Sequence, residues 1–121
     1  MGRDFRSSSS EIPKVSVVIP VYNAAGSIVE TLESVFAQTD PRFEILIIND
    51  GSPDTEQLEQ VIKPYLERIT YIKQQNAGAA AARNAGIKKS RGEIIAFLDG
   101  DDVWSPEYLA SQVEFLETGG F

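Results

Sequence analysis

The feature that most limits the fold is an alternation of short apolar runs with segments patterned as amphipathic helices. The apolar runs cover residues 15–20, 44–49, 69–73 and 94–98. Short runs rich in β-branched residues are typical of strands that are buried on both faces. Strands that alternate with helices form right-handed βαβ units, which build a parallel sheet with helices on both faces. The sequence therefore predicts an α/β fold, a Rossmann-like three-layer sandwich with a mainly parallel sheet.

Capping patterns mark where the helices begin and end. Ser27 and Glu30 form a capping box that predicts the first helix, and Asp54 stands at the predicted cap of the second. Pro64 should end or kink that second helix. Residues 79–89 are alanine-rich and predict the third helix, because alanine has the highest helix propensity.

A fourth helix is expected after the last strand. Ser105 would be its N-cap and Pro106 its first residue, and the helix would continue to about Glu117. Before the first strand, residues 1–13 are polar and lack periodicity, so they are expected to form a disordered leader. Residues 14–121 would then form the folded domain.

The order of the strands determines where a ligand would bind. In open parallel sheets, ligands bind outside the carboxyl ends of the strands, close to the point where the strand order reverses. We predict the strand order 3-2-1-4, which places this point between the first and fourth strands. The loop at Tyr22 and the acidic residues that begin at Asp99 would then face each other across one crevice. Asp50, at the end of the second strand, would line the same rim.

The strongest candidate for chemistry is the acidic sequence after the fourth strand. Asp99, Asp101 and Asp102 place three carboxylates within four residues, with Gly100 between the first two. Two carboxylates about 5 Å apart near a protein surface repel each other by roughly 3 kcal/mol, so a cation is expected between them. The sequence contains no His and no Cys, and a site made of oxygen ligands favours Mg²⁺, Mn²⁺ or Ca²⁺ over zinc or copper. A polar turn that leads into a helix cap is the alternative, and both descriptions can hold at once.

Charge and hydropathy exclude several classes of protein. The formal net charge of -7 argues against a general binder of nucleic acid or of anionic membranes, since Lys and Arg hold such partners. No apolar segment approaches the length of a membrane span, and the N-terminus lacks the hydrophobic core of a secretory signal. A cytoplasmic location is expected, peripheral to the inner face of a membrane if the chain is part of a longer protein.

Four of the predicted strand ends and one helix carry short motifs. Residues 20–23 read Pro-Val-Tyr-Asn, 50–52 Asp-Gly-Ser, 76–78 Asn-Ala-Gly, 82–86 Ala-Arg-Asn-Ala-Gly and 99–102 Asp-Gly-Asp-Asp. This ordered set resembles the family 2 glycosyltransferases, whose nucleotide-sugar half has a Pro-x-Tyr-Asn loop, an Asp-Gly-Ser turn, an Asn-x-Gly loop with an Ala-Arg-Asn-x-Gly stretch, and an Asp-x-Asp-Asp metal motif. The resemblance covers roughly residues 15–116. It implies a GT-A fold, with residues 14–121 as its nucleotide-sugar-binding part.

The resemblance also implies roles for individual residues. The contacts with a nucleotide-sugar would come from Pro20, Val21, Tyr22, Asn23, Asp50, Asn76, Gly78, Arg83, Asp99 and Gly100. Asp50 would accept a hydrogen bond from the imide N–H of uracil, and Tyr22 would stack on the base. Without the family, Asp50 is equally suited to capping a turn, Tyr22 to a half-buried place in a loop, and Asn76 with Gly78 to a plain turn.

The metal site follows in the same way from the resemblance. Asp101 corresponds to the direct ligand of Mn²⁺ or Mg²⁺, and Asp99 to the residue that contacts the ribose and approaches the metal. Asp102 is expected to support the loop. Arg83 would reach a phosphate or brace an aspartate of the site, because its guanidinium group suits either anion.

The expected activity is transfer of a sugar, with inversion, from a nucleotide-diphosphate donor to an acceptor hydroxyl. A UDP-sugar is favoured, although dTDP presents the same imide to Asp50. The acceptor would be a carbohydrate or a lipid-linked molecule. The catalytic base is expected beyond Phe121, so residues 1–121 alone are expected to transfer sugar poorly or not at all, and a homodimer is a further expectation.

Other classes of function fit the motifs less well. A non-catalytic nucleotide-binding or interaction module remains the main alternative. A receiver-type phosphoacceptor domain needs paired acids after the first strand, where this sequence has Tyr22 and Asn23. A dinucleotide-dependent oxidoreductase needs a G-x-G-x-x-G loop, which residues 22–26 do not contain.

Overall fold

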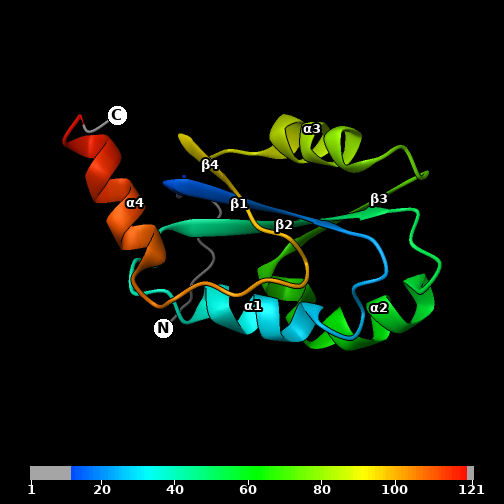
Figure 1. The fold of residues 1–121 in the computed structure, drawn as a ribbon. Helices are drawn as coiled ribbons and strands as arrows, with labels where there is room; N and C mark the ends of the chain where they lie inside the picture. The colour runs from blue at the N-terminus through cyan, green and yellow to red at the C-terminus, as the bar shows by residue number, and fades with distance from the viewer. Residues whose placement is uncertain (1–11, 120–121) are drawn as a thin grey trace.

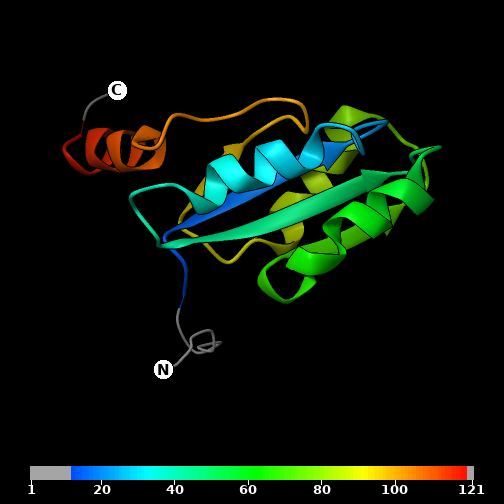
Figure 2. The same cartoon turned by 90° about the horizontal axis from the view of Figure 1, so that it is seen from below.

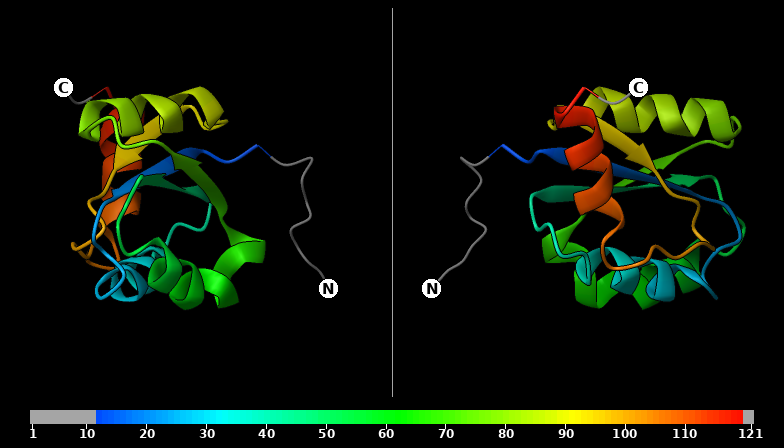
Figure 3. Two further views of the ribbon diagram at one scale, coloured as in Figure 1. Left: turned by 90° about the vertical axis from the view of Figure 1, so that its right-hand side faces the viewer. Right: turned by 60° about the vertical axis from the view of Figure 1, so that its left-hand side comes forward.

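The structure is a computed structural model that describes residues 12–119. A four-stranded sheet forms the middle layer, with α3 on one face and α1 and α2 on the other (Figures 1 and 3). The elements in chain order are β1 (Val15–Val21), α1 (Ile28–Phe36), β2 (Phe43–Asp50), α2 (Thr55–Ile62), η2 (Lys63–Arg68), β3 (Thr70–Gln74), α3 (Ala79–Lys89), β4 (Ile94–Phe97) and α4 (Tyr108–Glu117). The predicted leader lies outside the described residues, apart from Ile12 and Pro13.

The sheet is parallel throughout and has the order β3-β2-β1-β4. The predicted strand order is therefore confirmed. Val17 of β1 pairs with Ile45 on one side and with Ala96 on the other. Because every strand runs in the same direction, all four carboxyl ends lie at one edge of the sheet, which we call the carboxyl edge.

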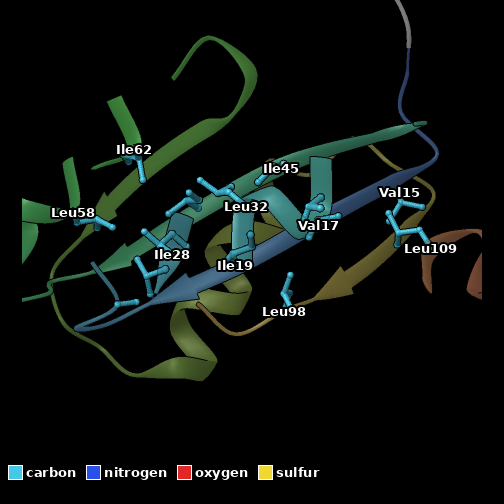
Figure 4. Packing of buried hydrophobic residues seen from close by; sticks show 14 of the residues in the cluster. Val15, Val17, Ile19, Ile28, Leu32, Ile45, Leu58, Ile62, Leu98 and Leu109 are labelled. Carbon is cyan, nitrogen blue, oxygen red and sulfur yellow. The ribbon is translucent and has the colours of Figure 1, made fainter. Parts of the chain in front are cut away.

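The larger part of the core lies between the sheet and the two helices α1 and α2. Alternate residues of β1 and β2 point to this side, where they pack against Ile28 and Leu32 of α1 and Leu58 of α2 (Figure 4). Each of these three side chains is fully buried. Burial of an aliphatic side chain of this size stabilises the fold by about 1.5–3 kcal/mol. Figure 2, which views the molecule from below, shows α1 and α2 in front of the strands.

The other face of the sheet packs closely against α3. Val18, Leu46 and Ile48 meet Ala82 in a second, smaller core. A Cβ placed on Gly86 would lie 2.4 Å from Cγ1 of Val18, so this position of the helix has no room for a side chain. The small side chains of this alanine-rich helix let it lie close to the sheet.

α4 lies at the end of the sheet opposite to the carboxyl edge (Figure 1). Leu109 and Val113 are buried in the main core, and Nζ of Lys14 is 2.8 Å from a carboxylate oxygen of Glu117. A groove of about 310 Å³ runs between α4 and β4, which is one of the two edge strands of the sheet. This groove lies away from the loops at the carboxyl edge.

The capping predictions were partly wrong. Ser27 and Asp54 precede α1 and α2, but neither side chain makes a capping hydrogen bond to its helix. Both are used in tertiary contacts instead, since Ser27 Oγ donates to the carbonyl of Gly100 and Asp54 accepts from the N–H of Ala25. α4 begins at Tyr108 rather than at Pro106.

Pro64 acts as predicted. The regular turns of α2 end at Ile62, and the chain continues as the short 3₁₀ helix η2 with Pro64 in its first turn. Proline has no N–H with which to continue an α-helical ladder, and this accounts for the change of helix type.

Candidate functional site

Three exposed carboxylates gather just beyond β4. Asp99, Asp101 and Asp102 each offer an oxygen, and these oxygens lie within 4.8 Å of one another. The N–H of Asp102 donates to the carbonyl of Asp99 (3.1 Å), which closes a tight turn. Ligand oxygens on opposite sides of a Mg²⁺ ion lie about 4.2 Å apart at its usual bond lengths of about 2.1 Å. The three carboxylates therefore have the chemistry that suits a hard cation, and their oxygens lie close to the spacing that the ligands of such a cation have.

This geometry changes one assignment made from the sequence. Asp102 was expected only to support the loop, whereas the structure places its carboxylate in the same cluster as Asp99 and Asp101. A turn of this kind brings residues at either end of a short segment together, which the sequence pattern does not specify. Asp102 thus joins the candidate ligands.

Gly100 anchors the acidic turn in the protein. It is buried, and a Cβ at this position would lie 2.9 Å from Val21 and 3.1 Å from Ala24. Its carbonyl accepts hydrogen bonds from the hydroxyls of Ser27 (2.8 Å) and Thr31 (3.1 Å). The carbonyl of Gly100 is thus occupied by the protein itself, while the predicted contact between Gly100 and a donor stays a prediction.

Asp50 is buried at the end of β2 and is surrounded by donors from the next loop. One carboxylate oxygen accepts from the side chain of Gln74 (2.9 Å) and the N–H of Ala77 (2.8 Å). The other accepts from the side chain of Asn76 (3.2 Å) and the N–H of Gly78 (3.0 Å). Burial raises the pKa of Asp50, but the hydrogen bonds from Gln74, Ala77 and Gly78 outweigh it and hold the pKa below its usual value.

These four donors match the four acceptor positions of a carboxylate. Asp50 therefore fixes the conformation of residues 74–78, the loop that borders the carboxyl edge. The imide N–H of a base would have to replace one of these donors in order to bind the carboxylate. The predicted base-reading role of Asp50 is untested by this geometry, and the loop-organising role is the one the contacts display.

The β2–α2 turn and the loop after β3 approach each other very closely. Gly51 has a φ of +63°, and a Cβ on it would lie 2.5 Å from the backbone nitrogen of Asn76. Only glycine adopts this conformation without strain and leaves room for the neighbouring backbone. Asn76 and Gly78 are exposed beside this contact, so both can be reached by a ligand at the rim.

The β1–α1 loop is fixed by hydrogen bonds to the β2–α2 turn. Asn23, which has a φ of +57°, donates its N–H to Ser52 Oγ (2.7 Å), and Ala25 donates its N–H to Asp54 (2.9 Å). Ser52 in turn donates its hydroxyl to Asp54. These bonds leave Tyr22 at the rim, with 53% of the residue exposed. A tyrosine held in this way can stack on a planar ligand.

The two residues before Tyr22 differ in accessibility. Pro20 is half-buried, but Val21 is almost completely buried in the main core and contacts Gly100. The side chain of Val21 therefore cannot form an open wall of a nucleoside pocket, and only its main chain remains available. Successive residues of a strand point to opposite faces, which accounts for the difference.

Arg83 lies on α3 beside the end of β4. The central carbon of its guanidinium group is 6.0 Å from the centroid of the Phe97 ring, within the range of a cation–π contact. In residues 12–119 Arg83 forms no ion pair, so the predicted bracing of an aspartate is not observed. Its charge remains available close to the acidic turn.

Comparison with known proteins agrees with these motifs. The family model described as Glycosyl transferase family 2 matches residues 16–121. The chain belongs to glycosyltransferase family 2. The resemblance that the motifs indicated is thereby confirmed.

The chain covers only a small part of a curated relative. An uncharacterized glycosyltransferase of Rickettsia bellii is 47% identical over 110 residues, which cover 89% of this chain and 16% of that protein. The chain thus spans less than a fifth of the length of this relative. Membership of the family therefore assigns no activity of a complete enzyme to this chain.

Solved structures of similar proteins share the fold. TarS 1-349 of S. aureus, determined in complex with UDP-GlcNAc, has a TM-score of 0.76 and 32% identity, covering 87% of this chain and 31% of TarS 1-349. The mannosyltransferase PcManGT of Pyrobaculum calidifontis, in complex with GDP-Man and Mn²⁺, has a TM-score of 0.73 and 25% identity, covering 88% of this chain and 33% of PcManGT. The fold is therefore of the GT-A type.

One set of residues around the family 2 motifs was missed from the sequence. Thr31, Ser34 and Gln38 received no role, while Ser27 was assigned to a cap. All four side chains bond to the main chain between residues 100 and 109. Their spacing of three or four residues places them on one face of a helix, and this signal was readable in the sequence.

Proposed function

We propose that this chain is the donor-binding part of an inverting glycosyltransferase, and that it binds a nucleotide-diphosphate sugar through Mn²⁺ or Mg²⁺. The observation that carries the proposal is the clustering of three carboxylates beside a rim that also displays Tyr22. The solved complexes of TarS with UDP-GlcNAc and of PcManGT with GDP-Man and Mn²⁺ support this class of ligand.

Asp101 and Asp99 are the residues that would hold the cation, with Asp102 within reach of it. Carboxylates supply only some of the ligands that a small hard cation needs, which leaves positions for diphosphate oxygens and water. The cation would neutralise the charge that develops on the departing diphosphate. Arg83 is the nearby cationic side chain proposed to bind a phosphate of the donor.

The nucleoside is proposed to bind between the β1–α1 loop and the loop that Asp50 organises. Tyr22 is exposed for stacking on the base, and Asn76 with Gly78 borders the same space. A UDP-sugar is preferred because an imide N–H is the group that Asp50 would accept. This preference requires the base to displace one of the donors that Asp50 binds in the structure.

The complete reaction is proposed for a longer protein. The acceptor would be a carbohydrate or a lipid-linked molecule, and a carboxylate outside residues 1–121 would remove the proton of its hydroxyl. In the described residues no helix is long and apolar enough to cross a membrane. Residues 1–121 alone are proposed to bind the donor and to transfer sugar poorly.

Calorimetric titration of UDP into the chain tests the proposal. Binding is expected in the presence of Mn²⁺, and it should be lost both in a chelator and in Asp101→Asn. Glu114→Gln is a matched control. Glu114 is an exposed carboxylate on α4, which lies at the opposite end of the sheet from the carboxyl edge. Absence of binding by the folded wild-type chain at millimolar UDP with Mn²⁺ would contradict the proposal.

A further inference from the structure

The chain between β4 and α4 has an unusual path. After the acidic turn it does not form another regular element at the carboxyl edge, but runs back along the whole length of α1 to reach α4 (Figures 1 and 2). An irregular segment has no ladder of its own for its N–H and carbonyl groups. Those groups must find partners elsewhere when they are buried.

One face of α1 provides these partners. We call this set of side chains the α1 polar stripe. It consists of Thr31 and Ser34 on α1, Ser27 just before the helix and Gln38 just after it. Ser27 and Thr31 both donate to the carbonyl of Gly100, at 2.8 and 3.1 Å. This carbonyl lies in the middle of the acidic turn.

The stripe continues beyond the acidic turn. Ser34 Oγ accepts the N–H of Trp104 (3.2 Å), and the side-chain amide of Gln38 donates to the carbonyl of Ser105 (2.7 Å). The same amide group accepts the N–H of Leu109 (2.9 Å) at the start of α4. The stripe therefore fastens the returning segment at several points from residue 100 to residue 109.

Two of these polar side chains lie inside the protein rather than on its surface. Thr31 is fully buried and Gln38 is 6% exposed, next to apolar neighbours such as Leu32 and Val35. A buried hydroxyl or amide costs free energy unless it is hydrogen-bonded, and a valine in place of Thr31 would avoid that cost. The hydrogen bonds to residues 100–109 therefore account for the polar residues of the stripe.

The acidic turn needs these hydrogen bonds because repulsion between its carboxylates works against its closed conformation. Carboxylates within 4.8 Å of one another repel, so the turn tends to open when no cation is bound. Two hydroxyls on the Gly100 carbonyl, together with the contacts of Gly100 to Val21 and Ala24, hold the turn from behind. The ligands are then close together before a cation binds, so less conformational entropy is lost on binding.

We propose that the α1 polar stripe positions the acidic turn for the divalent cation, with Thr31 as the principal positioning residue. The proposal rests on the proposed function, because it assumes that the acidic turn binds the cation. Thr31 touches neither the cation nor the donor. It acts only through the Gly100 carbonyl between Asp99 and Asp101.

The test compares variants of Thr31 in the full chain. Mn²⁺ affinity is measured from the electron paramagnetic resonance signal of free Mn²⁺, with and without UDP. Thr31→Val keeps the shape but removes the hydroxyl, and it should weaken Mn²⁺ binding about 3- to 10-fold, as expected for one hydrogen bond. Thr31→Ser keeps the hydroxyl and should remain within about twofold of the wild type.

Two further variants separate positioning from stability. Val35→Ala shortens a buried side chain of the same helix that lies in the main core, so it should lower stability while leaving Mn²⁺ affinity unchanged. Ser27→Ala removes the second hydroxyl from a half-buried site and should weaken Mn²⁺ binding even if Thr31→Val does not fold.

The outcomes distinguish the two proposals. Wild-type affinity for Mn²⁺ in Thr31→Val or Ser27→Ala, with binding intact in the wild type, would overturn the positioning role alone. Equal weakening in Val35→Ala and Thr31→Val would also overturn it, because the effect would then follow stability. Failure of the wild-type chain to bind Mn²⁺ would overturn the proposed metal site and the positioning role with it.

Discussion

At the scale of single residues, Asp50 illustrates what the sequence could and could not predict. Its place at the end of β2 and at the rim of the site followed from the pattern of apolar runs. Its partners did not, because they come from residues 74–78, more than twenty positions away along the chain. A contact of this separation depends on the register of β2 and β3, which the pattern of either strand alone does not specify.

Replacement of Asp50 by Asn should be costly. Either orientation of the amide would place its NH₂ group against two of the donors that now bond to the carboxylate, so those hydrogen bonds would be lost. We expect Asp50→Asn to lower the free energy of unfolding by about 1–3 kcal/mol in a urea titration. Asp99→Asn is the matched control: this carboxylate is exposed and repelled by its neighbours, so its loss should leave stability unchanged or raise it. Equal losses in both variants would contradict the account of Asp50.

The same carboxylate should make stability depend on pH. Because hydrogen bonds hold the pKa of Asp50 below its ordinary value of 3.8, its contribution to stability is present above that pH. The contribution is lost as the pH falls through the lowered pKa of the folded state. The difference in unfolding free energy between wild type and Asp50→Asn should therefore be constant from pH 7 to 5 and shrink in stronger acid. A difference that grows as the pH falls would contradict the sign of the shift.

At the scale of elements, the strands and helices were predicted within a few residues, whereas their ends were predicted less well. Apolar runs and alanine content are local features, so β1 and α3 could be read from the sequence. The role of Ser27 could not be read in this way, because Gly100 competes for its hydroxyl from the far side of the fold. Capping patterns describe what a side chain does when no tertiary partner is present.

The packing of α3 on the sheet gives a prediction at this scale. Gly86→Ala would place a Cβ 2.4 Å from Val18, so the helix must move away from the sheet. We expect a loss of about 1–3 kcal/mol in unfolding free energy, the range found when a tight core is overfilled. Gly26→Ala is the control, because nothing lies within 4 Å of the Cβ that it adds. A Gly86→Ala protein as stable as the Gly26→Ala protein would show that α3 packs less closely than described.

At the scale of the whole molecule, the strand order places all the motif-bearing loops at the carboxyl edge and α4 at the opposite end of the sheet. The alternation of elements predicted the strand order, and the motif order indicated the family, but neither predicted the place of α4. They did not predict that α1 would fasten the segment that joins the two ends. That connection needs the returning path of residues 98–107, a region without periodicity in the sequence.

Nuclear magnetic resonance of the chain tests the central claim most directly. Amide resonances would be followed as UDP is added in the presence of Mg²⁺, with Asp101→Asn as the comparison. The account predicts the largest shifts at the carboxyl edge, at Tyr22, Gly78 and Asp101, and none at Val113 in the groove between β4 and α4. Shifts centred on that groove, or shifts that persist in Asp101→Asn without Mg²⁺, would contradict a metal-dependent nucleotide site at the carboxyl edge.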